Sequence, residues 1–101
     1  MEHIVLLALV RLKGNAYGMT VRREIETRTG RNISIGAIYA TLERLEAKGY
    51  VSSFLGEATA ERGGRAKRLF RMEPGGEAAL RGSQEAIRRM TIGLQRRWGT
   101  S

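Results

Sequence analysis

The sequence predicts a mainly α-helical protein with one small two-stranded β hairpin, the wing, and a long helix at its C-terminal end. Three observations lead to this fold class. First, apolar residues recur at helical spacing in four segments. Second, a serine, a proline or a glycine marks the ends of these segments. Third, a glycine-rich polar stretch separates two β-compatible runs. The length of 101 residues is that of one domain.

The first predicted helix covers residues 2–12. Its aliphatic residues lie on most sides of the helix, which is typical of a helix in a core or an interface. The stretch is too short to span a bilayer and lacks the features of a signal peptide. Gly14 is suited to the left-handed conformation that follows a helix end, and we expect Leu6 to contribute to a subunit interface.

The second predicted helix runs from about residue 17 to residue 29. Tyr17, Val21 and Ile25 repeat every four residues and form its inward face. Residues 30–33 then provide a turn of the length expected between the two helices of a helix-turn-helix.

The third predicted helix begins at Ser34, whose hydroxyl can accept a hydrogen bond from a free N–H of the first turn, and ends at Gly49. Its inward face repeats at spacings of four and three residues: Ile38, Leu42 and Leu45. The opposite face is predicted to carry small side chains first and basic ones later: Ala37, Ala40, Thr41, Arg44 and Lys48. Such a face suits a close approach to another molecule, although a merely solvated face is the alternative.

Two short strands are predicted over residues 50–55 and 66–72, joined by a flexible hairpin tip. Between residues 62 and 72 the wing contains basic residues and no acid: Arg62, Arg65, Lys67, Arg68 and Arg71. Because alternate residues of a strand share a face, Arg65 and Lys67 can point together toward a phosphate backbone or a minor groove.

The last predicted helix opens at Pro74, a position where the missing N–H costs nothing, and continues to Trp98. Apolar residues lie along one side of it, three of them seven residues apart: Leu80, Ile87, Met90, Leu94 and Trp98. This pattern predicts a helix–helix contact, with a partner subunit, with the chain's own first helix, or with both.

The order helix, helix, helix, strand, strand, helix is that of a winged helix-turn-helix with a dimerisation helix appended. We therefore expect a winged helix-turn-helix DNA-binding unit at residues 1–73 and a C-terminal dimerisation helix at residues 74–101.

The charge balance favours a polyanionic partner. The chain has 18 Lys and Arg against 10 Asp and Glu, a formal net charge of +8, although charge alone also fits a generically basic protein. On the third helix, Arg44 or Thr41 could meet base edges and the Ser34 end could anchor a phosphate. Tyr39 is either a half-buried core aromatic or a phosphate-contacting hydroxyl.

Catalysis has little support in the sequence. There is no cysteine, so disulfides, thiolate nucleophiles and zinc–cysteine sites are excluded, which fits a reducing cytoplasm. The single histidine, His3, has no clustered acid near it in sequence. Glu43 and Glu46 are interpreted as surface charges of a helix that also carries Arg44 and Lys48. We predict no enzymatic activity, no metal and no cofactor.

The chain resembles the PadR family of bacterial regulators over nearly its whole length. The specific part is Ser34-x-Gly36-x-Ile38-Tyr39 followed by Leu42-x-Arg44-Leu45-Glu46-x-x-Gly49, supported by the Tyr17-Gly18 pair and the Gly76 helix start. The chain departs from the family where Ala37 replaces the usual Thr and Ala40 the usual Pro, and the first change removes one expected hydroxyl contact.

The resemblance implies a transcription factor, usually a repressor, that binds a palindromic operator as a twofold dimer. The C-terminal helix would pack on the partner's first helix, and the DNA contacts would include Ser34, Tyr39, Arg44, Arg65 and Lys67, with Tyr17 near the backbone. Some members bind flat aromatic effectors through a tryptophan on the last helix. Trp98 is a candidate for such an effector contact, but a plain packing role in an interface is favoured, since tryptophan commonly fills interfaces.

Together these inferences give two sets of predicted site residues. The predicted DNA-binding set is Tyr17, Ser34, Ala37, Tyr39, Thr41, Arg44, Lys48, Arg62, Arg65 and Lys67. The predicted dimer interface is Leu6, Leu80, Ile87, Met90, Leu94 and Trp98. The alternative function is a protein-interaction module that uses the winged fold only for dimerisation. An RNA-binding protein is disfavoured, because no aromatic platform for stacking bases is evident.

Overall fold

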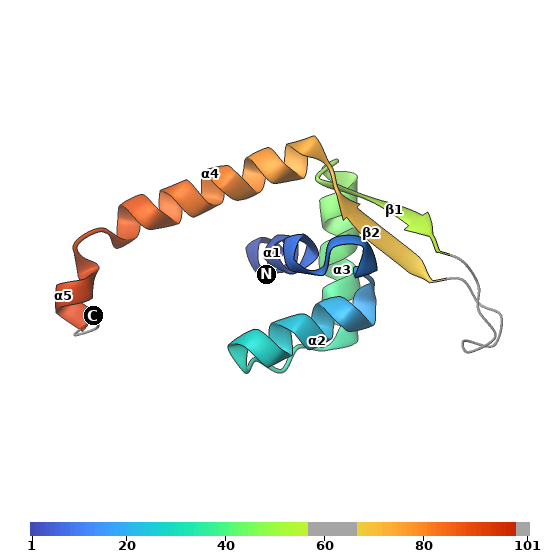
Figure 1. Ribbon diagram of the computed structural model, residues 1–101, viewed down its shortest axis with the longest axis horizontal. Helices are drawn as coiled ribbons and strands as arrows, with labels where there is room; N and C mark the ends of the chain where they lie inside the picture. The colour runs from blue at the N-terminus through green and yellow to red at the C-terminus, as the bar shows by residue number, and fades with distance from the viewer. Residues whose placement is uncertain (57–66, 99–101) are drawn as a thin grey trace.

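The computed structural model describes residues 1–56 and 67–98, and the predicted fold class is confirmed. Figure 1 shows three N-terminal helices packed together, with the β hairpin on one side and a long helix extending away on the other. The elements in chain order are α1 (Glu2–Leu12), the short 3₁₀ helix η1 (Lys13–Asn15), α2 (Gly18–Thr29), α3 (Ile35–Ala47), β1 (Val51–Leu55), β2 (Arg68–Met72), α4 (Pro74–Thr91) and α5 (Leu94–Trp98).

The core is formed by the inward faces of the three N-terminal helices together with one residue from each strand and one from α4. The inward residues predicted for α3 and, in α2, Val21 and Ile25 are buried. The largest fully buried side chains are Phe70, Ile38, Leu42, Leu45, Val5, Val21, Val51 and Thr41. Burial of each apolar side chain in this set contributes about 1.5–3 kcal/mol, so this small core fixes the orientation of α3 against α1 and α2.

Local signals set the ends of α3 as predicted. The Ser34 hydroxyl oxygen accepts a hydrogen bond from the Ala37 N–H at 3.1 Å, and Gly49 has a φ of 78°. The end of α1 differs from the prediction. Lys13 adopts the positive φ, 55°, because the chain turns directly into η1 one residue before Gly14.

The wing is an antiparallel pair in which Ser53 lies opposite Phe70. The free edge of β2 joins the segment that leads into α2, since the Phe70 N–H donates to the Ala16 carbonyl at 2.8 Å. This bond holds the wing beside the start of α2. The strands occupy the predicted positions but are slightly shorter than predicted.

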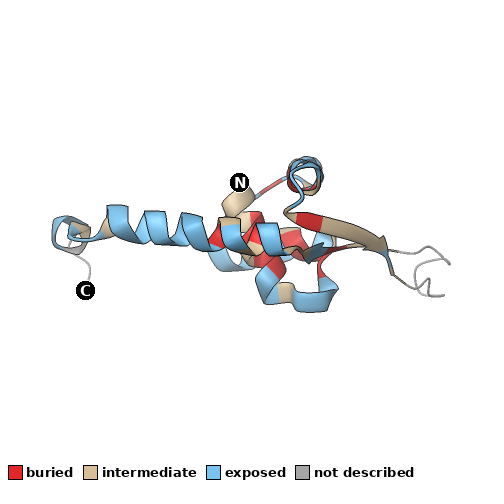
Figure 2. Ribbon diagram, turned by 90° about the horizontal axis from the view of Figure 1, so that it is seen from above, coloured by how far each residue is buried: buried red, intermediate tan, exposed pale blue. Residues whose placement is uncertain are grey.

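The start of α4 is fixed by a close contact that only glycine allows. A Cβ on Gly76 would lie 2.1 Å from the Tyr50 carbonyl oxygen and 2.7 Å from Met72 Sδ. Leu80, one turn further on, is buried in the core. From residue 81 to residue 90 every residue is exposed, and Figure 2 shows this part of α4 projecting past the helical body.

The prediction of one continuous C-terminal helix is wrong. Helix α4 ends at Thr91, Gly93 has a φ of 87°, and the short α5 follows. Gly93 carries no Cβ and adopts this conformation at little cost. Leu94 therefore leaves the line of Leu80 and Ile87 that the seven-residue spacing predicted. Within residues 1–56 and 67–98, no helix has the length and hydrophobicity that a membrane crossing requires.

Candidate nucleic-acid interface

The outward face of α3 is a strip of mostly small residues. It consists of Gly36, Ala40, Glu43 and Ala47, all exposed, which we call the α3 strip. Their spacings of four, three and four residues put them on one side of a helix with 3.6 residues per turn, opposite the buried face. No atom lies within 4 Å of the position that a Cβ on Gly36 would take. Another molecule can therefore approach the α3 backbone closely.

One flank of the α3 strip carries two cations that the start of α1 holds in place. Lys48 Nζ lies 2.8 Å and 3.0 Å from the two Glu2 carboxylate oxygens, and Arg44 Nε lies 3.5 Å from one of them. The hydrogen bond from Lys48 and the nearby Arg44 lower the pKa of Glu2. About half of each basic side chain is exposed, so both remain accessible from solvent.

The Tyr39 ring lies on the opposite flank of α3, against the start of α2. A Cβ on Gly18 would lie 2.4 Å from Tyr39 Cζ, so the ring packs where only glycine leaves room. Tyr39 is nevertheless 40 % exposed. Its ring is therefore held in position while part of it stays on the surface, and contact of its hydroxyl with a phosphate stays a prediction.

The wing reaches the same flank. Lys67 Nζ lies 4.0 Å from the centre of the Tyr17 ring, and Tyr17 immediately precedes α2. The Tyr17 N–H donates to Thr20 Oγ1 at 2.9 Å, which fixes the first turn of α2. Lys67 makes no ion pair within the part of the chain that the structure describes. Arg62 and Arg65 lie outside the described residues.

A second contact joins α3 to the wing through Glu46. Arg68 Nη2 lies 2.6 Å from Glu46 Oε1, and the Ser53 hydroxyl donates to Glu46 Oε2 at 2.6 Å. The hydrogen bond from Ser53, followed by the charge of Arg68, lowers the pKa of Glu46. Glu46 therefore pairs with the wing, while the cations of α3 pair with Glu2.

The prediction that Thr41 meets a partner is wrong. Thr41 is only 1 % exposed, because it lies four residues before the buried Leu45 and shares its side of the helix. Its hydroxyl donates to the Ala37 carbonyl at 2.8 Å and accepts a hydrogen bond from Arg44 Nη2 at 3.1 Å. Thr41 therefore helps to orient Arg44. Ser34 is exposed, but its hydroxyl caps α3, and Ala37 is half-buried.

The residues predicted for a dimer interface fall into two groups. Leu6 and Leu80 belong to the core of a single chain. The others lie further along the C-terminal helices: Ile87 is 52 %, Met90 79 % and Trp98 60 % exposed, and Leu94 is half-buried. The sequence predicts that the C-terminal helix contacts the chain's own first helix. This contact between α4 and α1 is present near Leu80, and it ends before Ile87.

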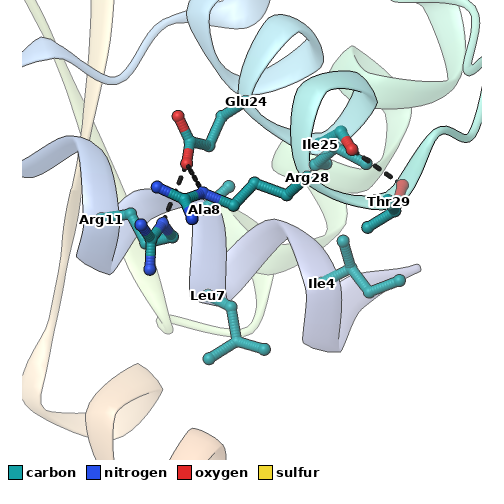
Figure 3. Close-up of a pocket in the computed structure, with 8 residues that line it drawn as sticks. All are labelled: Ile4, Leu7, Ala8, Arg11, Glu24, Ile25, Arg28 and Thr29. Atoms are coloured by element: carbon teal, nitrogen blue, oxygen red, sulfur yellow. Dashed lines mark hydrogen bonds and ion pairs between the residues drawn. The ribbon is translucent and has the colours of Figure 1, made fainter.

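A shallow groove of about 210 Å³ lies between α1 and α2, shown in Figure 3. Ile4, Leu7 and Ala8 line it from α1. Glu24 bridges its rim, with one carboxylate oxygen 2.9 Å from Arg11 Nε and 2.8 Å from Arg28 Nε. Ligand pockets are typically larger, about 300–1,000 Å³. Among the described residues, no three metal-ligating side chains gather at this groove or elsewhere.

Sequence reasoning missed two features of this surface, the Glu2 contact and the position of Glu43. Glu2 and Lys48 are 46 residues apart in sequence, and no local pattern joins them. The sequence pattern predicts Glu43 only as one of several surface charges, and the structure places it, exposed, within the α3 strip. Counting the helix positions opposite Ile38 and Leu42 would have placed it there.

Comparisons with known proteins agree with this description. Residues 6–82 match the model of the transcriptional regulator PadR-like family. No match was found among curated proteins.

Solved structures share the fold. A transcriptional regulator from Clostridium thermocellum is 22 % identical with a TM-score of 0.77, covering 95 % of this chain and 90 % of its own. A PadR family transcription regulator from Clostridium difficile is 20 % identical with a TM-score of 0.76, and the match covers 94 % of this chain and 95 % of that chain. A PadR-like transcriptional regulator from Bacillus cereus is 14 % identical with a TM-score of 0.80, and the match covers 99 % of this chain and 92 % of that chain.

Proposed function

The chain belongs to the PadR-like family of transcriptional regulators, and from this premise we propose that it binds a palindromic operator as a homodimer and represses transcription. The family is one of regulators and not of enzymes. Repression would act by steric occlusion of a promoter. Residues 1–73 would form the DNA-binding unit and residues 74–101 the dimerisation helix.

The observation that carries the proposal is the α3 strip with cations on both flanks. A B-DNA major groove is about 12 Å wide and admits one α-helix. With the strip against the groove floor, Arg44 and Lys48 would face the phosphates on one side. Lys67 would face those on the other. Phosphate contacts on both sides fix the orientation of a helix in the groove.

The Glu2 contact fits this arrangement. In the free protein the Glu2 carboxylate holds Lys48 and Arg44 beside the α3 strip. Exposed ion pairs of this kind contribute about 0–1 kcal/mol, so phosphates can replace Glu2 at little cost. The tyrosines on the other flank add neutral contacts, with the Tyr39 and Tyr17 hydroxyls as donors to phosphate oxygens.

Dimerisation is supported by the uncovered apolar side of the C-terminal helices. Ile87, Met90 and Ile92 are exposed in one chain, and exposed apolar patches on a small protein mark interaction sites. The partner's α1 is the occupant that we propose, as the resemblance to the PadR family implies. Two recognition helices would then enter successive major grooves about 34–36 Å apart.

We also propose that a flat aromatic effector binds at Trp98, between the C-terminal helices of the two subunits. Trp98 lies on α5 beyond the break at Gly93, with 60 % of it exposed. A ligand stacked on Trp98 would change how α5 and α4 pack between subunits. The spacing of the two recognition helices would change with it.

Selection of bound duplexes from a random pool tests the proposal. We expect an inverted repeat whose half-site centres are about 10–10.5 base pairs, or a multiple of that distance, apart. Lys67→Ala should weaken binding to all sequences alike, because a phosphate contact carries no sequence information. Arg81→Ala on the polar face of α4 is the matched control and should bind as the unmodified protein does. If no duplex is enriched, the operator proposal fails. Failure to bind any duplex at low salt would favour the protein-interaction module.

A further inference from the structure

Glu43 is the only long side chain of the α3 strip. The other three members are glycine or alanine, so the Glu43 carboxylate projects beyond its neighbours. If α3 lies in a major groove, this carboxylate is the first group of the α3 strip to reach the base edges. This step rests on the function proposed above.

Glu43 is also the one carboxylate among the described residues that has no partner. Each of the others accepts a hydrogen bond or pairs with a cation: Glu2, Glu24, Glu26, Glu46, Glu73, Glu77 and Glu85. Cations three or four residues away on a helix could pair with it, but those positions are Tyr39, Ala40, Glu46 and Ala47. In a chain of net charge +8, the unpaired acid lies where a polyanion would bind.

An ionised carboxylate in this place has a narrow choice of partners. It accepts hydrogen bonds and cannot donate them, and phosphates would repel it. Guanine presents only acceptors in the major groove and thymine an acceptor and a methyl group, whereas the amino groups of cytosine and adenine donate. Carboxylates characteristically accept from cytosine N4, while bidentate contacts to adenine are made by Asn and Gln.

We propose that Glu43 is a specificity-determining residue that accepts a hydrogen bond from the N4 amino group of a cytosine in each operator half-site. Arg44 is held on the flank by Glu2 and Thr41, so Glu43 and Arg44 have different tasks. Glu43 rejects base pairs that place an acceptor or the thymine methyl group, in place of the amino donor, opposite its carboxylate. The flanking cations supply affinity that does not depend on sequence.

The test is duplex selection with the unmodified protein and with Glu43→Ala, followed by binding titrations on the selected site. The unmodified protein should select a cytosine at one position of each half-site. Replacing that C·G pair by another should weaken its binding roughly 5- to 150-fold, the usual effect of one mismatch. Glu43→Ala should lose this preference, keep the preferences elsewhere, and bind random duplex more tightly because a negative charge is gone.

Two further variants separate the charge from the contact. Glu43→Gln should move the preferred base at that position toward adenine, since a glutamine amide can bond to adenine N6 and N7. Glu77→Gln removes the same charge from α4 and should leave the selected sequence unchanged. Glu43 is exposed, so thermal melting of the Glu43 variants should match that of the unmodified protein.

The outcomes distinguish this inference from the proposed function. If the unmodified protein selects a defined site and Glu43→Ala selects the same site with equal stringency at every position, Glu43 does not determine specificity and the inference fails. If the unmodified protein selects no site, the proposed function fails first and the inference falls with it.

Discussion

Raising the salt concentration from 50 to 200 mM is expected to weaken operator binding by roughly 10³- to 10⁵-fold. Cations flank the α3 strip on both sides in each subunit, and a dimer would make roughly six to ten phosphate contacts with them. Each contact releases condensed counterions from the duplex, so affinity falls steeply as salt rises. Fluorescence anisotropy with a labelled operator, repeated at several salt concentrations, measures the slope.

Single variants assign that slope to particular cations. Lys67→Ala removes one contact per subunit and should reduce the magnitude of the log–log slope by about 2 per dimer. Arg81→Ala changes the net charge equally but lies on α4, on the helix face away from Leu80 and Ile87, and should leave the slope unchanged. Equal slopes for all three proteins would show that Lys67 does not contact phosphate.

The second large effect is expected from Ile87→Asp, which should convert the dimer into folded monomers. Ile87 is 52 % exposed in one chain, so an aspartate there leaves the protomer core intact. In the proposed dimer the twofold axis would bury two such carboxylates without partners, which costs several kcal/mol per ion. Sedimentation velocity at micromolar concentration measures the change in mass.

Ala78→Asp is the matched control for dimerisation. Ala78 is exposed on the helix face opposite Ile87, so the same carboxylate there should leave the dimer intact. An Ile87→Asp protein that still sediments as a dimer would place the subunit interface elsewhere. Loss of operator binding together with the dimer is the expected secondary result, because one half-site alone contributes far fewer phosphate contacts.

The order of the elements could be predicted because its signals are local. Ser34 caps α3, Gly49 ends it, and the apolar spacing from Ile38 to Leu45 identifies its buried face. The same signals were available for Thr41, which was placed on the wrong side. Its spacing from Leu45 marks it as inward, but its hydroxyl suggested a contact residue. The hydroxyl is instead satisfied inside the helix, by the Ala37 carbonyl and Arg44.

The arrangement of the candidate site could be predicted only in part, because it depends on contacts between distant residues. The packing of Tyr39 on Gly18 and the pairing of Lys48 with Glu2 arise when the helices pack, and neither has a signature along the chain. The break at Gly93 was missed for a related reason. A seven-residue apolar spacing predicts which side of a helix is buried, but not whether the helix continues where no other element covers it.

The most direct test of the central claim is to locate the α3 strip on the operator. The chain has no cysteine, so Ala40→Cys provides a single thiol for a DNA-cleaving iron chelate, and Ala78→Cys on α4 provides the control. We predict cleavage from residue 40 at two sites in the major groove about 34–36 Å apart, with little from residue 78. Cleavage from residue 78 alone, or none from residue 40 on a bound operator, would contradict the placement of α3 against the duplex.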